Sequence, residues 1–576
     1  MSTHSPRVYN KQLELEDFAR IAPPSHRHAA PSAPWPWVDI EDAVDPAQLA
    51  SPLPPVPEPC DHISCGGCWK GYPQSLYPNW TPGQVEKSKI KKAIEEYRHD
   101  ISCVIHRVDV DRNGLFDVPN PSQIVSNDKN LADTWEAIIN SNVPVDNRVR
   151  ALFIENMSGP VLQMLGAKYN IEPFFFSSSL NWIPSRYEEE VRPGQGDHIT
   201  ITLTFLRSVS NSEAIRLSAV SPYATSSASL GKKSLLADQM IDTQAPLSLT
   251  SNGRLLLLDL LSVHLIRRKH GSTIISYHAD KDLPTTTAPY LHERIRFAGQ
   301  SVYWQSIFQK SPDPTFVLLT FIWHAVYAWD QALENLYSHI CFLETRVINT
   351  SEMALTQELH IIRAHHLHYT SLLEDFRKTV VFIRDTKNPA LDSLSKTEQE
   401  FSAHLMTREC ANLLIEIDRL EMGRHMQGQR LKNVMNLVFS SVNILDSKRM
   451  QKMTEAAVRD SAGMKQIAYL TMVFLPASFV AAVFGMNVKE ISPDTHGTLP
   501  HYVAAALPFT LITVWIIVAS QSKYIFSENV SFWKRLAWPF LLLARSWGRE
   551  SFQEGMGGQN ARSPAFSSIS KAMQSH

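Results

Sequence analysis

Three consecutive residues in the C-terminal part of the chain, Gly485-Met486-Asn487, offer backbone and side-chain oxygens suited to cation chemistry. They close an uncharged apolar segment that begins near Gln466 and is long enough to span a bilayer. Asn487 offers a carboxamide oxygen, and Gly485 lets the backbone turn so that carbonyl oxygens point inward. Such uncharged oxygens can accept hydrogen bonds from the water shell of a cation that gives up its water reluctantly. The sequence therefore predicts a filter for a hydrated cation at the end of this segment.

Two acidic residues, Glu490 and Asp494, follow the predicted filter. In an external loop their carboxylates would concentrate divalent cations above the mouth of a pore. An ordinary solvated loop is the alternative, and the sequence leaves both open.

The filter needs membrane spans to position it. Residues 466–486 and 503–520 are uncharged apolar runs, and the loop between them is too short to hold a domain. They therefore form a hairpin with both ends on one side. Basic residues gather outside the hairpin and only Lys489 lies between the runs, so we expect both termini in the cytoplasm. Two buried core helices are the alternative.

Residues that are mostly small or hydroxylated repeat every three or four positions in the first span. They are Met464, Ala468, Thr471, Leu475, Ser478, Ala482 and Gly485. This helix face can line a narrow water path between several copies of the chain, with Met464 and Leu475 as constrictions that close by dewetting. Close helix packing through small residues is the alternative. One two-span chain cannot enclose a pore, so the pore hypothesis requires a homo-oligomer.

The elements before the spans fall into two classes. Alternating and continuous apolar runs predict strands at residues 101–108, 149–155, 199–206, 214–220, 255–267 and 273–278, and a helix is expected at 160–169. From about residue 300 the pattern is helical. Asp313-Pro314 begins one helix, and a long one runs from Lys396 with no proline before Pro476.

These patterns predict an α+β membrane protein with five parts. They are a disordered Pro-rich arm (1–84), a cytoplasmic α/β domain (85–300), a helical bundle with a stalk helix (301–463), the two-span hairpin (464–522) and a basic cytoplasmic tail, partly an interfacial helix (523–576).

Bulk composition excludes several classes of function. The chain has 55 Lys+Arg and 57 Asp+Glu, so no strong net field indicates a nucleic-acid partner. Six scattered cysteines fit a reducing compartment. The first twenty or so residues lack the apolar core of a secretory signal. We find no nucleotide loop and no nucleophile–base arrangement, so we expect neither an enzyme nor a bound cofactor.

A second constellation, Cys60-x-His62-x-x-Cys65-x-x-Cys68, has the spacing and side chains of a zinc site. Unpaired thiols in a flexible arm are the alternative.

The first span resembles that of the CorA-like magnesium transporters. The shared features are the entering Met464-Lys465, the mid-span Pro476, Ser478 two residues later and the final Gly-Met-Asn. The stretches 150–156, 165–166 and 171–175 resemble the soluble domain of the divergent fungal CorA-like group. The resemblance implies a homopentamer with a cytoplasmic α/β funnel and a stalk helix that continues into the first span. By position it implies a selectivity ring of Gly485, Met486 and Asn487, and a pore lined or gated by Met464, Ile467, Leu475 and Ser478.

The resemblance implies a channel-like transporter of divalent metal cations, above all Mg2+, which is cargo and not a cofactor. The chain departs from the family pattern at Phe484, which replaces Tyr, and at Lys489, which brings positive charge near the entrance. Ser461 stands where the family often has an Asn ring. Two alternatives remain: a membrane-anchored sensor or interaction protein that does not conduct, and a zinc transporter on the same fold.

Overall fold

The computed structural model describes residues 67–116, 123–140, 147–210, 241–279, 285–349, 353–485 and 499–520, together with a few isolated positions before residue 63 and at 537. The chain divides into two units, Met1–Val442 and Asn443–His576.

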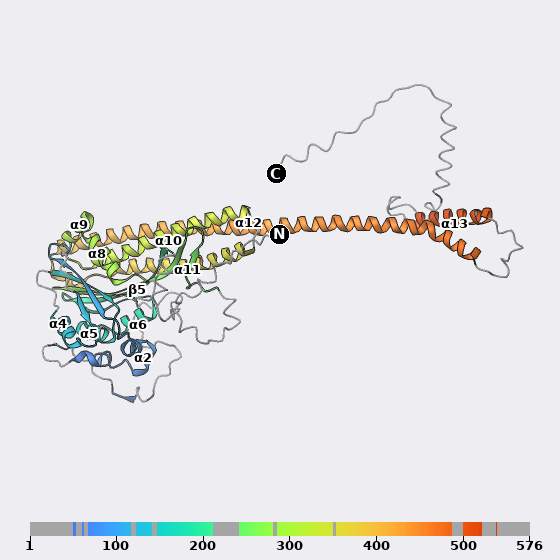
Figure 1. The fold of residues 1–576 in the computed structure, drawn as a ribbon. Helices are drawn as coiled ribbons and strands as arrows, with labels where there is room; N and C mark the ends of the chain where they lie inside the picture. Colours follow the sequence, from blue (N-terminus) through green and yellow to red (C-terminus); the bar gives the residue numbers. More distant parts are fainter. Residues whose placement is uncertain are drawn as a thin grey trace, which may run out of the picture. The chain divides into compact units, whose positions relative to one another are not determined.

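An eight-stranded mixed sheet lies at the centre of the first unit (Figure 1). Its strand order is β2-β1-β3-β8-β7-β5-β4, with β6 paired to β7. β3 and β8 are parallel and the other neighbours are antiparallel. The strands are β1 (Cys103–Asp111), β2 (Ile124–Ser126), β3 (Asn147–Glu155), β4 (Ser185–Arg192), β5 (Gly196–Ser210), β6 (Leu247–Leu249), β7 (Arg254–Arg268) and β8 (Ser272–Tyr277). Five of the six predicted strands are present, and the sixth, at 214–220, lies outside the described residues.

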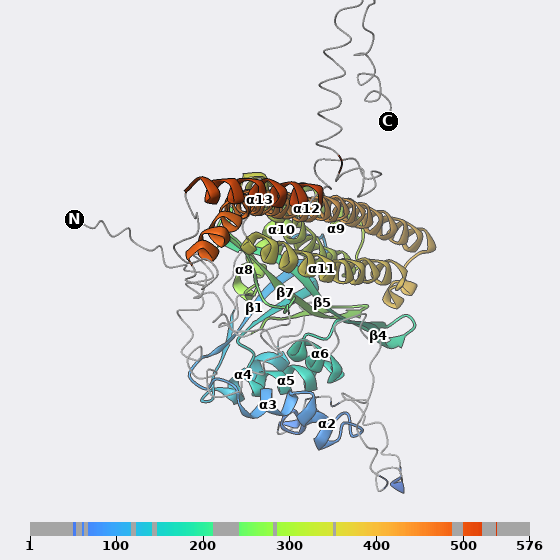
Figure 2. The same cartoon turned by 90° about the vertical axis from the view of Figure 1, so that its right-hand side faces the viewer.

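Helices cover both faces of the sheet (Figure 2). On one face lie α2 (Pro82–Lys87), α3 (Ile90–Glu95), α4 (Leu131–Asn140), α5 (Gly159–Tyr169), α6 (Phe174–Asn181) and the short η2 (Cys68–Gly71). On the other lie α8 (Ala288–Gly299), α9 (Val302–Lys310), α10 (Thr315–Asn349), α11 (Met353–Asp385) and the first part of α12 (Lys396–Gly485), with η4 (Pro389–Ser393) between α11 and α12.

The side-chain alternation of β3 explains why the sheet has helices on both faces. Ala151 and Phe153 pack into the core beneath α10, whereas Leu152 and Ile154 pack into the core formed with α5. Neighbouring side chains of a strand point to opposite faces, so a strand of apolar residues must be buried on both sides.

A buried arginine, Arg267, ties the sheet to the helical layer. Its Nε donates to Asp197 Oδ1 at 2.6 Å, and the second guanidinium nitrogen also contacts this carboxylate. The same guanidinium donates to Thr315 Oγ1 at 3.3 Å and to the Lys387 carbonyl at 3.0 Å. The charged pair thus has its remaining donors satisfied, as burial requires.

The structure corrects the predicted disordered arm at its C-terminal end. Trp69, Tyr72 and Trp80 are buried in the core around α5. The Tyr72 hydroxyl donates to the Ile171 carbonyl at 2.8 Å, and Trp80 Nε1 donates to Glu172 at 2.9 Å. Residues 67–84 therefore belong to the α/β domain, because their few aromatic side chains outweigh a polar, proline-rich average composition.

The second unit contains the end of α12 and α13 (Leu499–Ser520). Among the described residues, α12 is the one helix that is long and apolar enough to cross a membrane. The apolar part of α13, Val503–Ile516, falls short of that length.

Candidate functional site

The apolar end of α12 carries the predicted pore residues. The helix continues through Pro476, which has no N–H to donate, so the carbonyl of Met472 lacks its usual helical partner. Two hydroxyls turn back onto the backbone: Thr471 Oγ1 donates to the Ala468 carbonyl and Ser478 Oγ to the Leu475 carbonyl, both at 2.9 Å. Their oxygen lone pairs remain available as acceptors.

One face of this helical segment packs against α13. The ring of Phe479 stacks on Phe509 with centroids 6.3 Å apart, and Pro476 and Ala506 are buried. At about 100° per residue, Phe479 lies about 100° around the helix from Ser478 but only about 40° from Leu475, so the contact with α13 borders the predicted pore face. Leu475 and Ser478 are nevertheless exposed beside this contact.

The predicted pore face is exposed in the single chain. Met464, Ile467 and Leu475 are 69%, 64% and 67% exposed, and Ser478 is also exposed. Only 6% of the most apolar window of α12 is buried. So much exposed apolar surface indicates lipid or further protein around the helix.

Gly485 is the last residue of α12, and a side chain there would meet nothing within 4 Å. Met486, Asn487, Glu490 and Asp494 lie outside the described residues. The filter and the cation-attracting loop therefore stay predictions.

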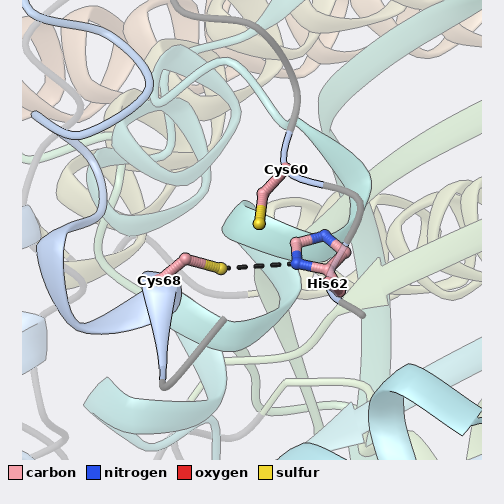
Figure 3. Close-up of side chains that lie close together, drawn as sticks. All are labelled: Cys60, His62 and Cys68. Carbon is pink, nitrogen blue, oxygen red and sulfur yellow. Dashed lines mark hydrogen bonds between the residues drawn. The ribbon is translucent and has the colours of Figure 1, made fainter. Parts of the chain in front are cut away.

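The zinc-like constellation is partly brought together. The ligand atoms of Cys60, His62 and Cys68 lie within 4.8 Å of one another, and the Cys68 sulfur is 3.3 Å from His62 Nδ1 (Figure 3). Cys65 lies outside the described residues.

A third group, Glu189, His198 and His264, was not predicted from the sequence. Glu189 on β4 pairs with His198 on β5, and His264 on β7 pairs with Thr200, so the sheet register places all three on one face. Burial lowers the pKa of His198 to about 4, and burial also lowers the pKa of His264 well below its usual value. Nearby Arg268 adds positive charge and also lowers the pKa of His198. The lowered pKa values keep these imidazoles neutral, and the positive charge of Arg268 opposes a cation beside His198.

An open cavity of about 660 Å3 lies in the first unit among α8, α9, α10 and α12. Phe297, Tyr303 and Tyr327 line it and are 75%, 52% and 67% exposed. Sequence periodicity did not reveal this surface, because it depends on how four helices pack.

Residues 272–520 match the sequence model described as CorA-like Mg2+ transporter protein. Comparison with curated protein sequences gives no significant match.

Among solved structures, the complete CorA magnesium transporter from Methanocaldococcus jannaschii is 12% identical, with a TM-score of 0.37, and the match covers 75% of this chain and 98% of that one. The soluble domain of the same transporter is 10% identical, with a TM-score of 0.33, over 58% and 96%. A structure of the full-length CmaX protein is 12% identical, with a TM-score of 0.30, over 72% and 98%.

Proposed function

Because residues 272–520 match the sequence model of CorA-like Mg2+ transporters, we propose that the chain is a channel-like transporter that carries divalent metal cations across a membrane, with Mg2+ as the main cargo. The observation that carries this proposal is the exposed face of α12 that leads through Leu475 and Ser478 to Gly485. A stripe of small and hydroxylated residues ending in Gly-Met-Asn suits a hydrated cation better than a lipid contact.

The membrane arrangement in this proposal is a two-span hairpin of α12 and α13. The stacked Phe479 and Phe509 support it, since they join the two apolar helices while Ser478 stays exposed. Basic residues occur before the first span and after the second, which places both termini in the cytoplasm. These basic residues are Lys448, Arg449, Lys452, Arg459, Lys465, Lys523, Lys534, Arg535, Arg545 and Arg549.

Several copies must surround the ion path, and a homopentamer is the proposed assembly. The exposed apolar face of α12 supports self-association, because a single hairpin leaves the side chains of Met464 and Leu475 69% and 67% exposed. The aromatic cavity around Phe297 and Tyr327 offers a second surface that another copy can cover.

In this mechanism the ion keeps much of its water shell at the filter. The carboxamide of Asn487 and the carbonyls near Gly485 accept hydrogen bonds from that water without adding a charge that would trap the ion. Glu490 and Asp494 raise the local cation concentration outside. Met464, Ile467 and Leu475 close the path by excluding water from an apolar ring.

A membrane-anchored sensor that does not conduct is the second candidate. Lys489 favours it, because a positive charge near the entrance opposes cation entry. Zinc transport on the same fold is the third candidate and differs from the first in cargo alone.

Cation flux into proteoliposomes tests the proposal. Wild-type protein should carry Mg2+ faster than Zn2+, and Asn487→Ala should reduce Mg2+ flux at least tenfold, whereas Asn487→Gln keeps a carboxamide and should retain more of it. No flux from the wild type would favour the sensor. Equal flux from wild type and Asn487→Ala would remove Asn487 from the mechanism, and faster Zn2+ flux would favour the zinc transporter.

A further inference from the structure

The side chains of Cys60, His62 and Cys68 converge at the edge of the α/β domain (Figure 3). Two thiols and one imidazole form a soft ligand set that suits zinc better than magnesium or calcium, which prefer oxygen ligands. This set lies far along the sequence from the proposed ion path and has no role in it.

The spacing of the ligand atoms fits a tetrahedral ion. Zinc lies about 2.3 Å from a thiolate sulfur and about 2.0–2.1 Å from an imidazole nitrogen, so a tetrahedral site separates sulfur from nitrogen by roughly 3.5 Å and two sulfurs by roughly 3.8 Å. The Cys68 sulfur and His62 Nδ1 are 3.3 Å apart, and all three ligand atoms lie within 4.8 Å. Small side-chain rotations would bring them to coordination distance.

Two residues with positive φ, His62 and Gly67, lie on either side of the segment that separates His62 from Cys68. His62 has φ of 60° and Gly67, directly before Cys68, has φ of 110°. A φ of 110° is readily adopted only by glycine. Gly67 therefore allows the turn that brings Cys68 back toward His62.

The cluster rests on an aromatic surface of the folded domain. The His62 ring meets Trp135 of α4 edge-on, with centroids 5.4 Å apart. Trp135 in turn contacts Trp69 of η2 with centroids 6.4 Å apart. Both tryptophans are 8% exposed. The His62–Trp135 contact limits the orientation of the imidazole and directs Nδ1 toward Cys68.

We propose that Cys60, His62 and Cys68 bind one Zn2+ ion that fastens the end of the N-terminal arm to the α/β domain beside Trp69 and Trp135. Two thiolates balance the charge of the ion, and the neutral imidazole supplies the third bond. A tetrahedral zinc ion takes a fourth ligand, which these three side chains do not supply. The ion closes a short loop of chain, and its binding free energy stabilises the arm's contact with α4 and η2.

Metal analysis of the full-length protein in detergent with a non-chelating reductant tests this proposal. We expect about one zinc per chain. Replacement by Co2+ should produce the near-ultraviolet absorption of a cobalt–thiolate bond. Cys60→Ser and Cys68→Ser should each weaken binding at least tenfold and reduce that absorption. Cys341→Ser, which changes a cysteine on α10, is the matched control and should bind as the wild type does.

A further variant should gain a signal, which a folding defect could not produce. His62→Cys should still bind Co2+ and should increase the thiolate absorption, because a third sulfur replaces the imidazole. Wild-type protein without zinc and without cobalt–thiolate absorption would overturn the proposal. So would equal zinc content in the wild type, Cys60→Ser and Cys68→Ser.

Discussion

Phe479 of α12 stacks on Phe509 of α13, with ring centroids 6.3 Å apart and ring planes 28° apart. Phe479 follows Ser478 directly, yet the two side chains lie about 100° apart around the helix. Phe479 therefore contacts α13, whereas Ser478, the residue before it, points to an exposed face of α12.

The aromatic pair should stabilise the hairpin. We expect a double-mutant cycle with Phe479→Leu and Phe509→Leu to give a coupling free energy of about 0.5–1.5 kcal/mol, the usual worth of an aromatic pair beyond its buried area. Unfolding in detergent by a chemical denaturant measures it. Strictly additive effects would mean that the two rings do not interact in the folded protein.

Leu475 should act as an apolar constriction. Replacing it with serine wets the path, so Leu475→Ser should raise Mg2+ flux in proteoliposomes several-fold. Leu470→Ser is the control: Leu470 is 59% exposed and Leu475 67%, but the two lie about 140° apart around the helix. Equal increases from both variants would argue for general disruption of the helix.

The buried Arg267–Asp197 pair should be costly to break. Both side chains are at most 1% exposed. Arg267→Met leaves the carboxylate of Asp197 buried without its cation, and we expect a loss of about 3–5 kcal/mol in the free energy of unfolding. Denaturant titration measures it. Arg384→Met, which removes a surface pair with Asp385, should change stability little; similar losses in both variants would contradict this account.

Stability should fall on acidification because several histidines are buried in their neutral form. His278 Nδ1 lies 2.9 Å from the Thr286 carbonyl and its Nε2 lies 3.0 Å from the Ser276 hydroxyl, as in a neutral ring that donates to the first and accepts from the second. Burial lowers the pKa of His278 to about 4. Below pH 6.5 the unfolded chain binds a proton that the folded chain does not. The stabilisation is therefore complete above pH 6.5 and is lost toward pH 4, by up to about 1.4 kcal/mol per pH unit.

Melting temperatures of wild type and His278→Gln between pH 7 and 4 check this prediction. The variant should be less stable at pH 7 but should lose less on acidification. Burial raises the pKa of Glu172 to about 6, which has the opposite sign, but it acts in both proteins and cancels from their difference. The exposed His404→Gln should follow the wild type. Parallel curves for wild type and His278→Gln would contradict the assignment.

Sequence patterns predicted the elements whose signal is local. The apolar run at 199–206 marks the middle of β5, and Asp313 caps α10 by accepting from the Thr315 N–H at 3.0 Å. The long helix from Lys396 has the predicted start. Such features depend on neighbouring residues alone, so periodicity and capping chemistry suffice to find them.

Features that depend on distant contacts were missed. Tyr72 is buried because Gly166 leaves room for its ring: a Cβ at Gly166 would lie 2.4 Å from that ring. The approach of His198 to His264 follows from strand register, which no local pattern specifies. At the candidate site, the sequence predicted which α12 residues share a face, whereas the burial of Pro476 depends on how α13 packs.

Chemical access to α12 tests the central claim most directly. A positively charged, water-soluble thiol reagent should block Mg2+ flux in proteoliposomes containing Ser478→Cys, because residue 478 faces the proposed ion path. It should leave Phe479→Cys and the wild type unchanged, since Phe479 faces α13 and the native cysteines all lie before residue 411. Block of Phe479→Cys with no block of Ser478→Cys would place the ion path on another face and contradict the account.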